Sequence, residues 1–330
     1  MMAAGLPEAR DLDVVVVGEL NADLVLTGLT SLPGYGEVRL AKDMRFALGS
    51  SSAIFACNLA RLGVKVGFVG KLGADETGDF LLRCLCNSGV DTSQIVQSPA
   101  GRTGICVIMS FPHEYAMASF PGIRETFCLE DVNFDYVKTA KHMHMSSFYL
   151  QPALQPGCPR LFRWAKEAGL STSLDPDYDP SGKWNSGLRA MLPYVDIFLP
   201  NEQEAAKISG ETEMLGALSS LSRLSKTVVI KRGASGVLTK CGERAVAAPG
   251  FSVQPVDTTG AGDSFNAGFV FQFIQVAPLV DCVAWGNACG ALSTRSLGGT
   301  AGFPARSEVE QFLSEHAEEL GKIRGAFASI

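Results

Sequence analysis

The chain has 330 residues and a mass of 35.0 kDa, which suits one large domain with a small appended lobe. Its composition, 46% hydrophobic and 19% charged residues, excludes a generally disordered or fibrous chain. The formal net charge of -6 argues against a general nucleic-acid-binding or anionic-membrane surface and favours small molecules as partners. No run approaches the roughly 18 apolar residues that a membrane span requires.

Cysteine usage and the N-terminus indicate the compartment. The nine cysteines are scattered through apolar stretches without a C-x-x-C pair, which is typical of reduced, buried thiols. Residues 1–10 lack the apolar core of a secretory signal peptide. The sequence therefore predicts a soluble cytoplasmic protein.

Strand and helix patterns alternate along most of the chain. Residues 13–18 (DVVVVG) are too apolar for a half-exposed strand, so we expect a central strand covered on both faces. Similar runs recur at residues 64–69, 142–146, 170–174, 195–199 and 227–230. Helical spacing lies between most of them, at residues 51–62, 76–88, 158–168, 202–208 and 214–225. This alternation predicts an α/β fold with a doubly wound, mostly parallel sheet.

The last third of the chain is mainly helical. Helical patterns occupy residues 263–274, 279 to about 295, and 307 to about 322. We expect these helices to pack on the sheet and close the domain. Because no internal repeat or flexible linker divides the sequence, residues 1–330 are expected to form a single domain.

Two stretches, residues 24–46 and 102–120, do not follow the alternation. They carry short strand-like pieces broken by Gly, Pro and Tyr, with no amphipathic helix between them. We interpret both as excursions from the main sheet that pair into a small β lid. Two ordinary surface loops are the alternative that the pattern leaves open.

The most informative peptide is residues 257–269, DTTGAGDSFNAGF. It follows a strand-like segment at residues 251–256 and runs into an apolar helical pattern, so residues 260–263 are expected to form the first turn of a helix. The first amides of a helix have no partner inside it, and Gly260 and Gly262 let a charged ligand approach that backbone. The turn is therefore suited to holding phosphate.

Asp263 adds a carboxylate at the same place. A carboxylate repels phosphate unless it accepts a proton from a group that attacks the phosphate, so the arrangement suits phosphoryl transfer to a hydroxyl. The alternative is structural, because an Asp at a helix start is often only a cap. A Walker loop is absent, and a dinucleotide fingerprint fails because Phe265 stands where its last glycine is expected.

The peptide resembles the second signature of the ribokinase-like sugar kinases, also called the phosphofructokinase-B family, whose core is D-T-x-G-A-G-D. The resemblance covers nearly the whole chain, in family order: NAD at residues 21–23, GSSSAIFACNLARLG at 49–63, LDP at 174–176, LPNEQE at 199–204, KRGASGV at 231–237 and GGTAGFP at 298–304. It implies an ATP-dependent carbohydrate kinase with a Rossmann-like α/β domain and a β lid.

The resemblance also assigns roles at the signature. Asp263 would be the general base that takes the proton from the sugar hydroxyl. The backbone amides of Gly260, Ala261 and Gly262 would form the anion hole, where donors already aimed at the transferring phosphoryl group stabilise its charge.

Further matches concern the nucleotide. Asn201 and Glu204 match the N-x-x-E motif, which implies a water-mediated Mg²⁺ site, since a hard cation that keeps its waters needs few protein ligands. A capping box formed by the same pair is an alternative that can hold at the same time. Lys231 and Gly233 lie where relatives approach the nucleotide phosphates, although the family often has a hydroxyl residue at the lysine. Asn287 matches a position near the adenine or ribose.

Residues 298–302 match a loop that wraps the nucleotide and, in some relatives, a potassium ion together with Asp257. Gly302 stands where a potassium-dependent relative uses a serine. The resemblance therefore implies ATP and Mg²⁺ and leaves potassium open.

On the substrate side, Asn21 and Asp23 resemble the pair that hydrogen-bonds sugar hydroxyls, to which an amide and a carboxylate are well suited. A turn stabilised by Asx hydrogen bonds is the alternative. Gly49, Ser50 and Ser51 would form the next contact, with the glycine allowing the sugar to lie against the backbone.

One departure bears on the substrate. In the family's G-G-x-x-x-N, Ser50 replaces the second glycine and Ile54 replaces the asparagine, and an apolar side chain does not favour a polyol. Plain ribose is therefore not expected. Asp175 resembles a position that faces the active site, and Arg102 or Arg124 from the lid would either pair with a carboxylate or phosphate on the sugar or be solvated. The candidates are a ketohexose and an acidic or phosphorylated sugar.

Two other functions stay open: a nucleoside kinase of the same superfamily and a catalytically silent sugar-binding regulator. The expected partners are a sugar and ATP, without nucleic acid or membrane, and the resemblance adds a homodimer through the lid. His142 and His144 alternate along a strand, but two ligands without a nearby third make a poor zinc site, so packing or hydrogen bonding is favoured.

Overall fold

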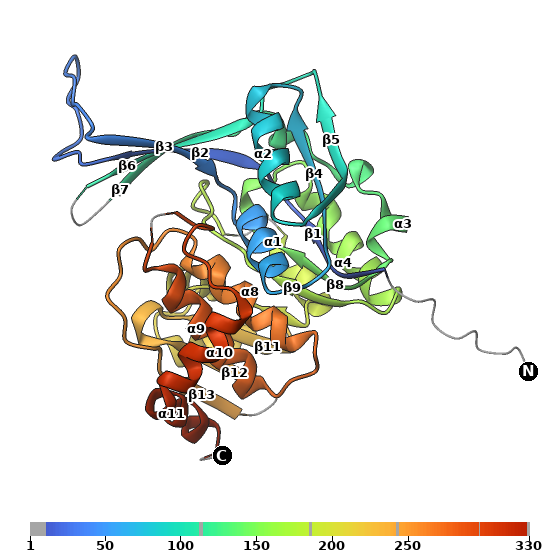
Figure 1. Cartoon of the computed structure of the whole chain (residues 1–330). Helices are drawn as coiled ribbons and strands as arrows, with labels where there is room; N and C mark the ends of the chain where they lie inside the picture. Colours follow the sequence, from blue (N-terminus) through green and yellow to red (C-terminus); the bar gives the residue numbers. More distant parts are fainter. Residues whose placement is uncertain (1–10, 112–114, 185–186, 242–243, 297, 329–330) are drawn as a thin grey trace, which may run out of the picture.

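The protein is described by a computed structural model that covers residues 11–111, 115–184, 187–241, 244–296 and 298–328. Residues 1–10, on which the expectation about a signal peptide rests, and residues 112–114 of the second expected lid segment lie outside the described residues. Two sheets organise the fold, one of nine strands in the order β13-β12-β11-β10-β9-β8-β1-β4-β5 and one of four in the order β3-β2-β6-β7 (Figure 1).

The nine-stranded sheet is mostly parallel, as predicted. Every ladder from β5 to β11 is parallel, and only the two ladders that join β11, β12 and β13 are antiparallel. Its strands are β1 (Leu12–Val17), β4 (Val66–Gly73), β5 (Asp91–Ser98), β8 (Ala140–Met145), β9 (Ser171–Leu174), β10 (Ile197–Phe198), β11 (Thr227–Lys231), β12 (Val237–Cys241) and β13 (Arg244–Ala248).

β1 lies inside this sheet, between β8 and β4, and is covered on both faces, also as predicted. Val14 and Val16 belong to one apolar cluster and Val15 and Val17 to the other, because successive side chains of a strand point to opposite faces. The first cluster is covered by α1 (Ser51–Arg61), α2 (Glu76–Asn87), α8 (Ala261–Phe273), α9 (Leu279–Ser293), α10 (Arg306–Glu315) and α11 (Ala317–Ala328). The second is covered by α3 (Phe134–Val137), α4 (Cys158–Glu167), α5 (Leu188–Met191), α6 (Glu202–Ser209) and α7 (Met214–Leu221).

Two local predictions were wrong. Residues 251–256 form a loop and not a strand. Phe251 packs against Phe312, and Pro255 lacks the amide hydrogen that a strand would donate to its neighbour. The helix expected over residues 307 to about 322 is two helices, α10 and α11, because His316 has φ -105° and ψ 43°, outside the helical region.

The four-stranded sheet is the β lid. It contains β2 (Asn21–Thr27), β3 (Asp43–Leu48), β6 (Gly104–Ser110) and β7 (Tyr115–Phe120), and β2 pairs parallel with β6 in its centre. In Figure 1 this sheet extends away from the helices. Only residues 18–20 separate β1 from β2, so the base of the lid lies at the carboxyl end of β1, the edge where open α/β sheets bind ligands.

Buried polar groups on β8 are satisfied within the core. His142 bonds the Ser171 and Ser173 hydroxyls at 2.8 and 2.7 Å, and His144 bonds those of Ser173 and Ser146 at 2.7 and 2.8 Å. The favoured interpretation of this pair, packing and hydrogen bonding, is confirmed. No helix in the described ranges is long and apolar enough to cross a membrane.

The close packing of α8 on α9 generates the first prediction. An alanine Cβ at Gly268 would lie 2.6 Å from the Cys289 sulfur and 2.7 Å from the Trp285 carbonyl oxygen. Gly268→Ala should therefore lower the free energy of unfolding by about 1–3 kcal/mol, as measured by urea denaturation. The control is Gly321→Ala on α11, where nothing lies within 4 Å and alanine should stabilise the helix by up to about 1 kcal/mol. Equal stabilities of the two variants would contradict this packing.

Candidate active site

The start of α8 presents unpaired amides. Gly260 precedes the helix with φ 71° and ψ 8°, a left-handed conformation that glycine adopts without strain. Within the described residues, the amides of Gly260, Gly262 and Asp263 donate to no protein acceptor. The Ala261 amide differs from expectation: the left-handed turn points it back to the Thr258 carbonyl, 3.1 Å away. The anion hole would therefore rest on the glycine amides and on Asp263 rather than on Ala261.

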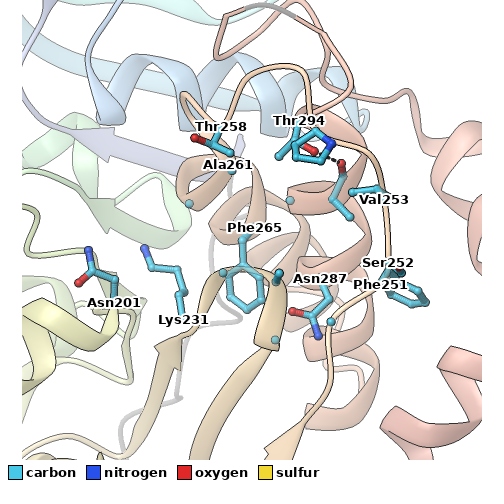
Figure 2. A pocket seen from close by; sticks show the side chains of 18 residues that line it. Asn201, Lys231, Phe251, Ser252, Val253, Thr258, Ala261, Phe265, Asn287 and Thr294 are labelled. Atoms are coloured by element: carbon cyan, nitrogen blue, oxygen red, sulfur yellow. Dashed lines mark hydrogen bonds between the residues drawn. The ribbon is translucent and has the colours of Figure 1, made fainter. Parts of the chain in front are cut away.

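A cavity of about 560 Å³ lies on one side of this turn (Figure 2). Its wall is mainly apolar, with Phe251, Val253 and Phe265 among the lining side chains, and Asn287 lies beside them with its amide nitrogen on the Pro249 carbonyl at 2.9 Å. The expected nucleotide residues Asn201, Lys231, Gly233, Gly262 and Asn287 all line this cavity. A mainly apolar cavity with a few polar groups in its wall is typical of a site for a small organic ligand.

Asn201 and Glu204 form the capping box of α6. The Asn201 side-chain oxygen accepts from the Glu204 amide at 2.9 Å, while the two Glu204 carboxylate oxygens accept from the Asn201 backbone and side-chain nitrogens at 2.8 and 2.6 Å. Burial, together with the nearby Asp175 carboxylate, raises the pKa of Glu204 to about 8. The capping alternative is confirmed.

The same pair offers hard oxygen donors, which fit Mg²⁺ held through water. Across the described ranges, no cluster of three His, Cys, Asp or Glu side chains could hold a metal ion directly. Any divalent cation here would therefore keep most of its waters or bind to oxygens of the nucleotide.

Asp263 faces a group of carboxylates rather than the apolar cavity. Burial, followed by the charges of Asp175, Asp177 and Glu19, raises the pKa of Asp263 well above its ordinary value, and the Lys231 ammonium opposes this rise. The residue is 8% exposed, and no donor in the described part of the chain hydrogen-bonds to its carboxylate. Asp263 is thus a buried acceptor beside unpaired amides.

Lys231 lies between the cavity and the carboxylates. Its ammonium contacts the Asp175 carboxylate at 2.5 Å and the Asn266 side-chain oxygen at 3.4 Å. Asn266 also donates to Asp175. The structure therefore places Asp175, expected as a sugar contact, in an ion pair with the lysine.

Asn21, Asp23 and Gly49 come together at the base of the lid. Asn21 donates from its amide to Asp23 at 3.0 Å, and a Cβ at Gly49 would lie 2.2 Å from the Asp23 carboxylate oxygen, so only glycine fits there. Burial raises the pKa of Asp23 to about 7, and the Glu19 charge adds to the effect.

The serines of the first signature have different surroundings. The Ser50 hydroxyl accepts from the Ala53 amide at 3.0 Å, which caps α1. It also lies within donating distance of the Glu19 backbone oxygen at 2.7 Å and the Glu19 carboxylate at 2.8 Å, so its hydrogen bonds are made within the protein. The Ser51 hydroxyl lies 3.4 Å from the Asp177 carboxylate. Ile54 is buried against the backbone of Gly260 and Gly299, where it fills space between α1 and the start of α8.

Of the two lid arginines, only Arg124 reaches the site. It is 5% exposed, donates to the Asn21 side-chain oxygen at 2.7 Å and lies 3.5 Å from the Glu19 carboxylate. Arg102 is exposed, which agrees with the solvated alternative. Arg102 lies near Asp75 instead. Burial raises the pKa of Asp75, but hydrogen bonds from Thr103 and Gly78, together with the charge of Arg102, lower it below its ordinary value.

Asp257 ties the residue 298–302 loop to the start of α8. Its two carboxylate oxygens accept from the Thr259 amide at 2.9 Å and the Gly298 amide at 2.8 Å. Nothing in this arrangement tests potassium binding, which stays a prediction.

Three residues of the site were not predicted from the sequence. Glu19 directly follows the central strand, Asp177 lies two positions after Asp175, and Asn266 lies three positions after Asp263 on α8. Two signals could have identified such residues: a polar residue directly after a buried strand, and polar residues that recur at helical spacing. Asp177 has φ 58° and accepts from the Ser147 hydroxyl at 2.8 Å, so its left-handed backbone is held by a neighbouring segment.

Comparisons with known proteins agree with this geometry. Residues 11–306 match the family described as pfkB family carbohydrate kinase. The chain is 30% identical to ribokinase of Haemophilus influenzae, over 92% of this chain and 99% of that one. It is also 30% identical to the ATP-dependent ribose-1-phosphate kinase of Halopiger xanaduensis, over 92% and 98%.

Among solved structures, Arabidopsis thaliana ribokinase complexed with ribose and ATP superposes with a TM-score of 0.79 and 25% identity, covering 92% of this chain and 98% of that one. The fold, the signature turn and the family match agree along nearly the whole chain. This protein belongs to the pfkB family of carbohydrate kinases.

Proposed function

We propose that the protein transfers the γ-phosphoryl group of ATP to a hydroxyl of a neutral sugar, a ketohexose being one candidate, and that Asp263 is the general base. One observation carries this proposal. A buried carboxylate without a hydrogen-bond partner in the described residues lies beside unpaired amides at the start of α8, between an apolar cavity and a group of polar side chains. That is the arrangement a proton acceptor needs when a hydroxyl attacks a phosphoryl group.

The cavity would hold the adenine and ribose, with the phosphates toward the Gly260 and Gly262 amides. Those donors, with Lys231, would stabilise the charge of the transferring group. Asn201 and Glu204 would hold Mg²⁺ through water, and the cation would neutralise part of the triphosphate charge. Asp263 would take the proton from the sugar hydroxyl, and its raised pKa makes it a stronger base than an ordinary carboxylate.

The charges around the sugar position favour a neutral substrate. Glu19, Asp23, Asp177 and Asp263 are carboxylates, while Arg124 is already bonded to Asn21 beside Glu19. The other buried cation described near the site, Lys231, is paired with Asp175. A carboxylate or phosphate on the substrate would therefore meet four carboxylates and two cations whose charges Glu19 and Asp175 already offset, which costs binding energy.

The lid supports the proposed homodimer. Its edge strands β3 and β7 carry exposed large apolar side chains, namely Met44, Phe46, Tyr115, Met117 and Phe120. Exposed edges with apolar side chains are suited to pairing with another chain. Dimerisation, potassium activation and a cytoplasmic location stay predictions.

A substrate panel tests the function directly. ADP release should require a neutral sugar, with a ketohexose giving a larger kcat/KM than acidic or phosphorylated sugars. Turnover with nucleosides instead would establish a nucleoside kinase. Tight sugar binding without turnover of any compound would support a silent regulator and contradict the proposal.

Removing the proposed base should separate turnover from binding. Asp263→Asn is expected to lower kcat by about 100-fold or more, the scale of positioned acid–base catalysis, while KM for ATP changes by only a few-fold. Because burial disfavours the carboxylate, the variant should also unfold about 2 °C higher in a thermal scan. Asp281→Asn on α9, outside the site, is the matched control. Near-normal turnover of Asp263→Asn would reject the assignment.

The titration of Asp23 predicts how sugar binding depends on pH. With a pKa of about 7 in the free protein, Asp23 is mostly protonated below neutrality and cannot accept hydrogen bonds from two sugar hydroxyls. The sugar Kd should therefore rise by up to about tenfold per pH unit below 7 and level off above it. Calorimetric titrations from pH 5.5 to 8.5 would measure this. Asp23→Asn should bind weakly at every pH, and a wild-type Kd independent of pH would contradict the role.

A further inference from the structure

We propose that Asp175 and Asn266 are positioning residues that hold the Lys231 ammonium at the start of α8, so that Asp175 acts on phosphoryl transfer through Lys231 and is not a sugar ligand. This inference rests on the proposed kinase function and deepens it.

Three elements bring the group together. Asp175 follows β9, Lys231 ends β11 and Asn266 lies on α8, and β10 alone separates the two strands in the sheet. One Asp175 oxygen accepts from both the Lys231 ammonium and the Asn266 amide at 2.5 Å. The Asn266 side-chain oxygen lies 3.4 Å from the same ammonium, so the three side chains all contact one another; we call this arrangement the ring.

The ring aims the ammonium at the unpaired amides. A Cβ at Gly262 would lie 3.4 Å from the Lys231 nitrogen, so the absence of a side chain there leaves the ammonium next to the first turn of α8. Lys231 and its backbone neighbour Asn201 both line the nucleotide cavity, where Figure 2 shows them together. An ammonium group has three donors, and the ring engages two of them, which leaves one for a phosphate oxygen.

Burial explains why the lysine needs this ring. Burial lowers the pKa of Lys231, but the Asp175 and Glu204 carboxylates outweigh that effect and raise it above its ordinary value, so the side chain stays cationic. A long lysine stem would otherwise sample many rotamers, and holding it in place beforehand avoids that cost when charge develops. An unpaired buried ammonium would also be strongly destabilising.

The hydrogen bonds of Asp175 argue against direct sugar binding. One of its oxygens carries the two contacts of the ring, and the other accepts from the Asp177 amide at 3.3 Å. Its side chain is 7% exposed. Asp23, whose carboxylate accepts from Asn21, and the proposed base Asp263 are better placed among the described carboxylates to accept hydrogen bonds from sugar hydroxyls.

A double-mutant cycle tests the inference through kcat and the sugar KM, measured separately. Lys231→Met is expected to lower kcat by about 100-fold and to change the sugar KM less than twofold. Asp175→Asn should lower kcat by about 10–100-fold with the same unchanged KM. In the Lys231→Met background, Asp175→Asn should change kcat less than twofold, because the group through which it acts is already gone.

Asp23→Asn is the control, since Asp23 is the proposed sugar-binding carboxylate and no contact between it and Lys231 is described; it should raise the sugar KM. A rise in the sugar KM on Asp175→Asn in both backgrounds, or additive losses of kcat, would overturn the inference. Absence of sugar-dependent turnover in the wild-type protein would instead refute the proposed function.

If either single variant fails to fold, the double variant Asp175→Asn/Lys231→Met remains informative, because removing both partners of a buried ion pair leaves no uncompensated charge. Its sugar Kd, measured by calorimetry, should stay within about twofold of wild type while turnover is lost. Loss of sugar binding in this folded double variant would show that Asp175 is a sugar ligand.

Discussion

The candidate active site depends on one local constraint at the start of α8. Gly260 turns the chain through a left-handed conformation, and the amides of Gly260, Gly262 and Asp263 donate to no acceptor in the described residues. The carboxylate of Asp263 lies on the same turn with no hydrogen bond of its own in that part of the chain. A ligand that bonds these unpaired donors and this acceptor replaces solvent there and gains binding energy at the reacting atoms.

The charged side chains around this turn suit the same chemistry. Carboxylates at Glu19, Asp175 and Asp177 raise the pKa of Asp263, which suits a base, while Lys231 and Arg124 offset part of the repulsion. The two cations belong to different sides of the site: Lys231 lines the nucleotide cavity and Arg124 contacts Asn21 at the base of the lid. Charge is thereby divided between a side suited to phosphate and a side suited to hydroxyl groups.

Features set by local sequence were predictable, and features set by distant contacts were not. The apolar run of β1 and the glycine spacing before α8 each determine a local conformation, so both were expected correctly. The ion pair between Lys231 and Asp175 joins residues 56 positions apart and depends on strand order, which no local pattern encodes. Likewise the pattern could not tell that the lid turns Arg124 inward and leaves Arg102 exposed.

The most direct test is a crystal structure with ADP, aluminium fluoride, Mg²⁺ and a neutral sugar that is turned over, because the metal fluoride takes the place of the transferring phosphoryl group. The account predicts that its fluorides lie within hydrogen-bond distance of the Gly262 amide and the Lys231 ammonium, with a sugar hydroxyl between the fluoride and Asp263. A metal fluoride remote from the start of α8, or an Asp263 carboxylate that meets no sugar hydroxyl, would contradict it.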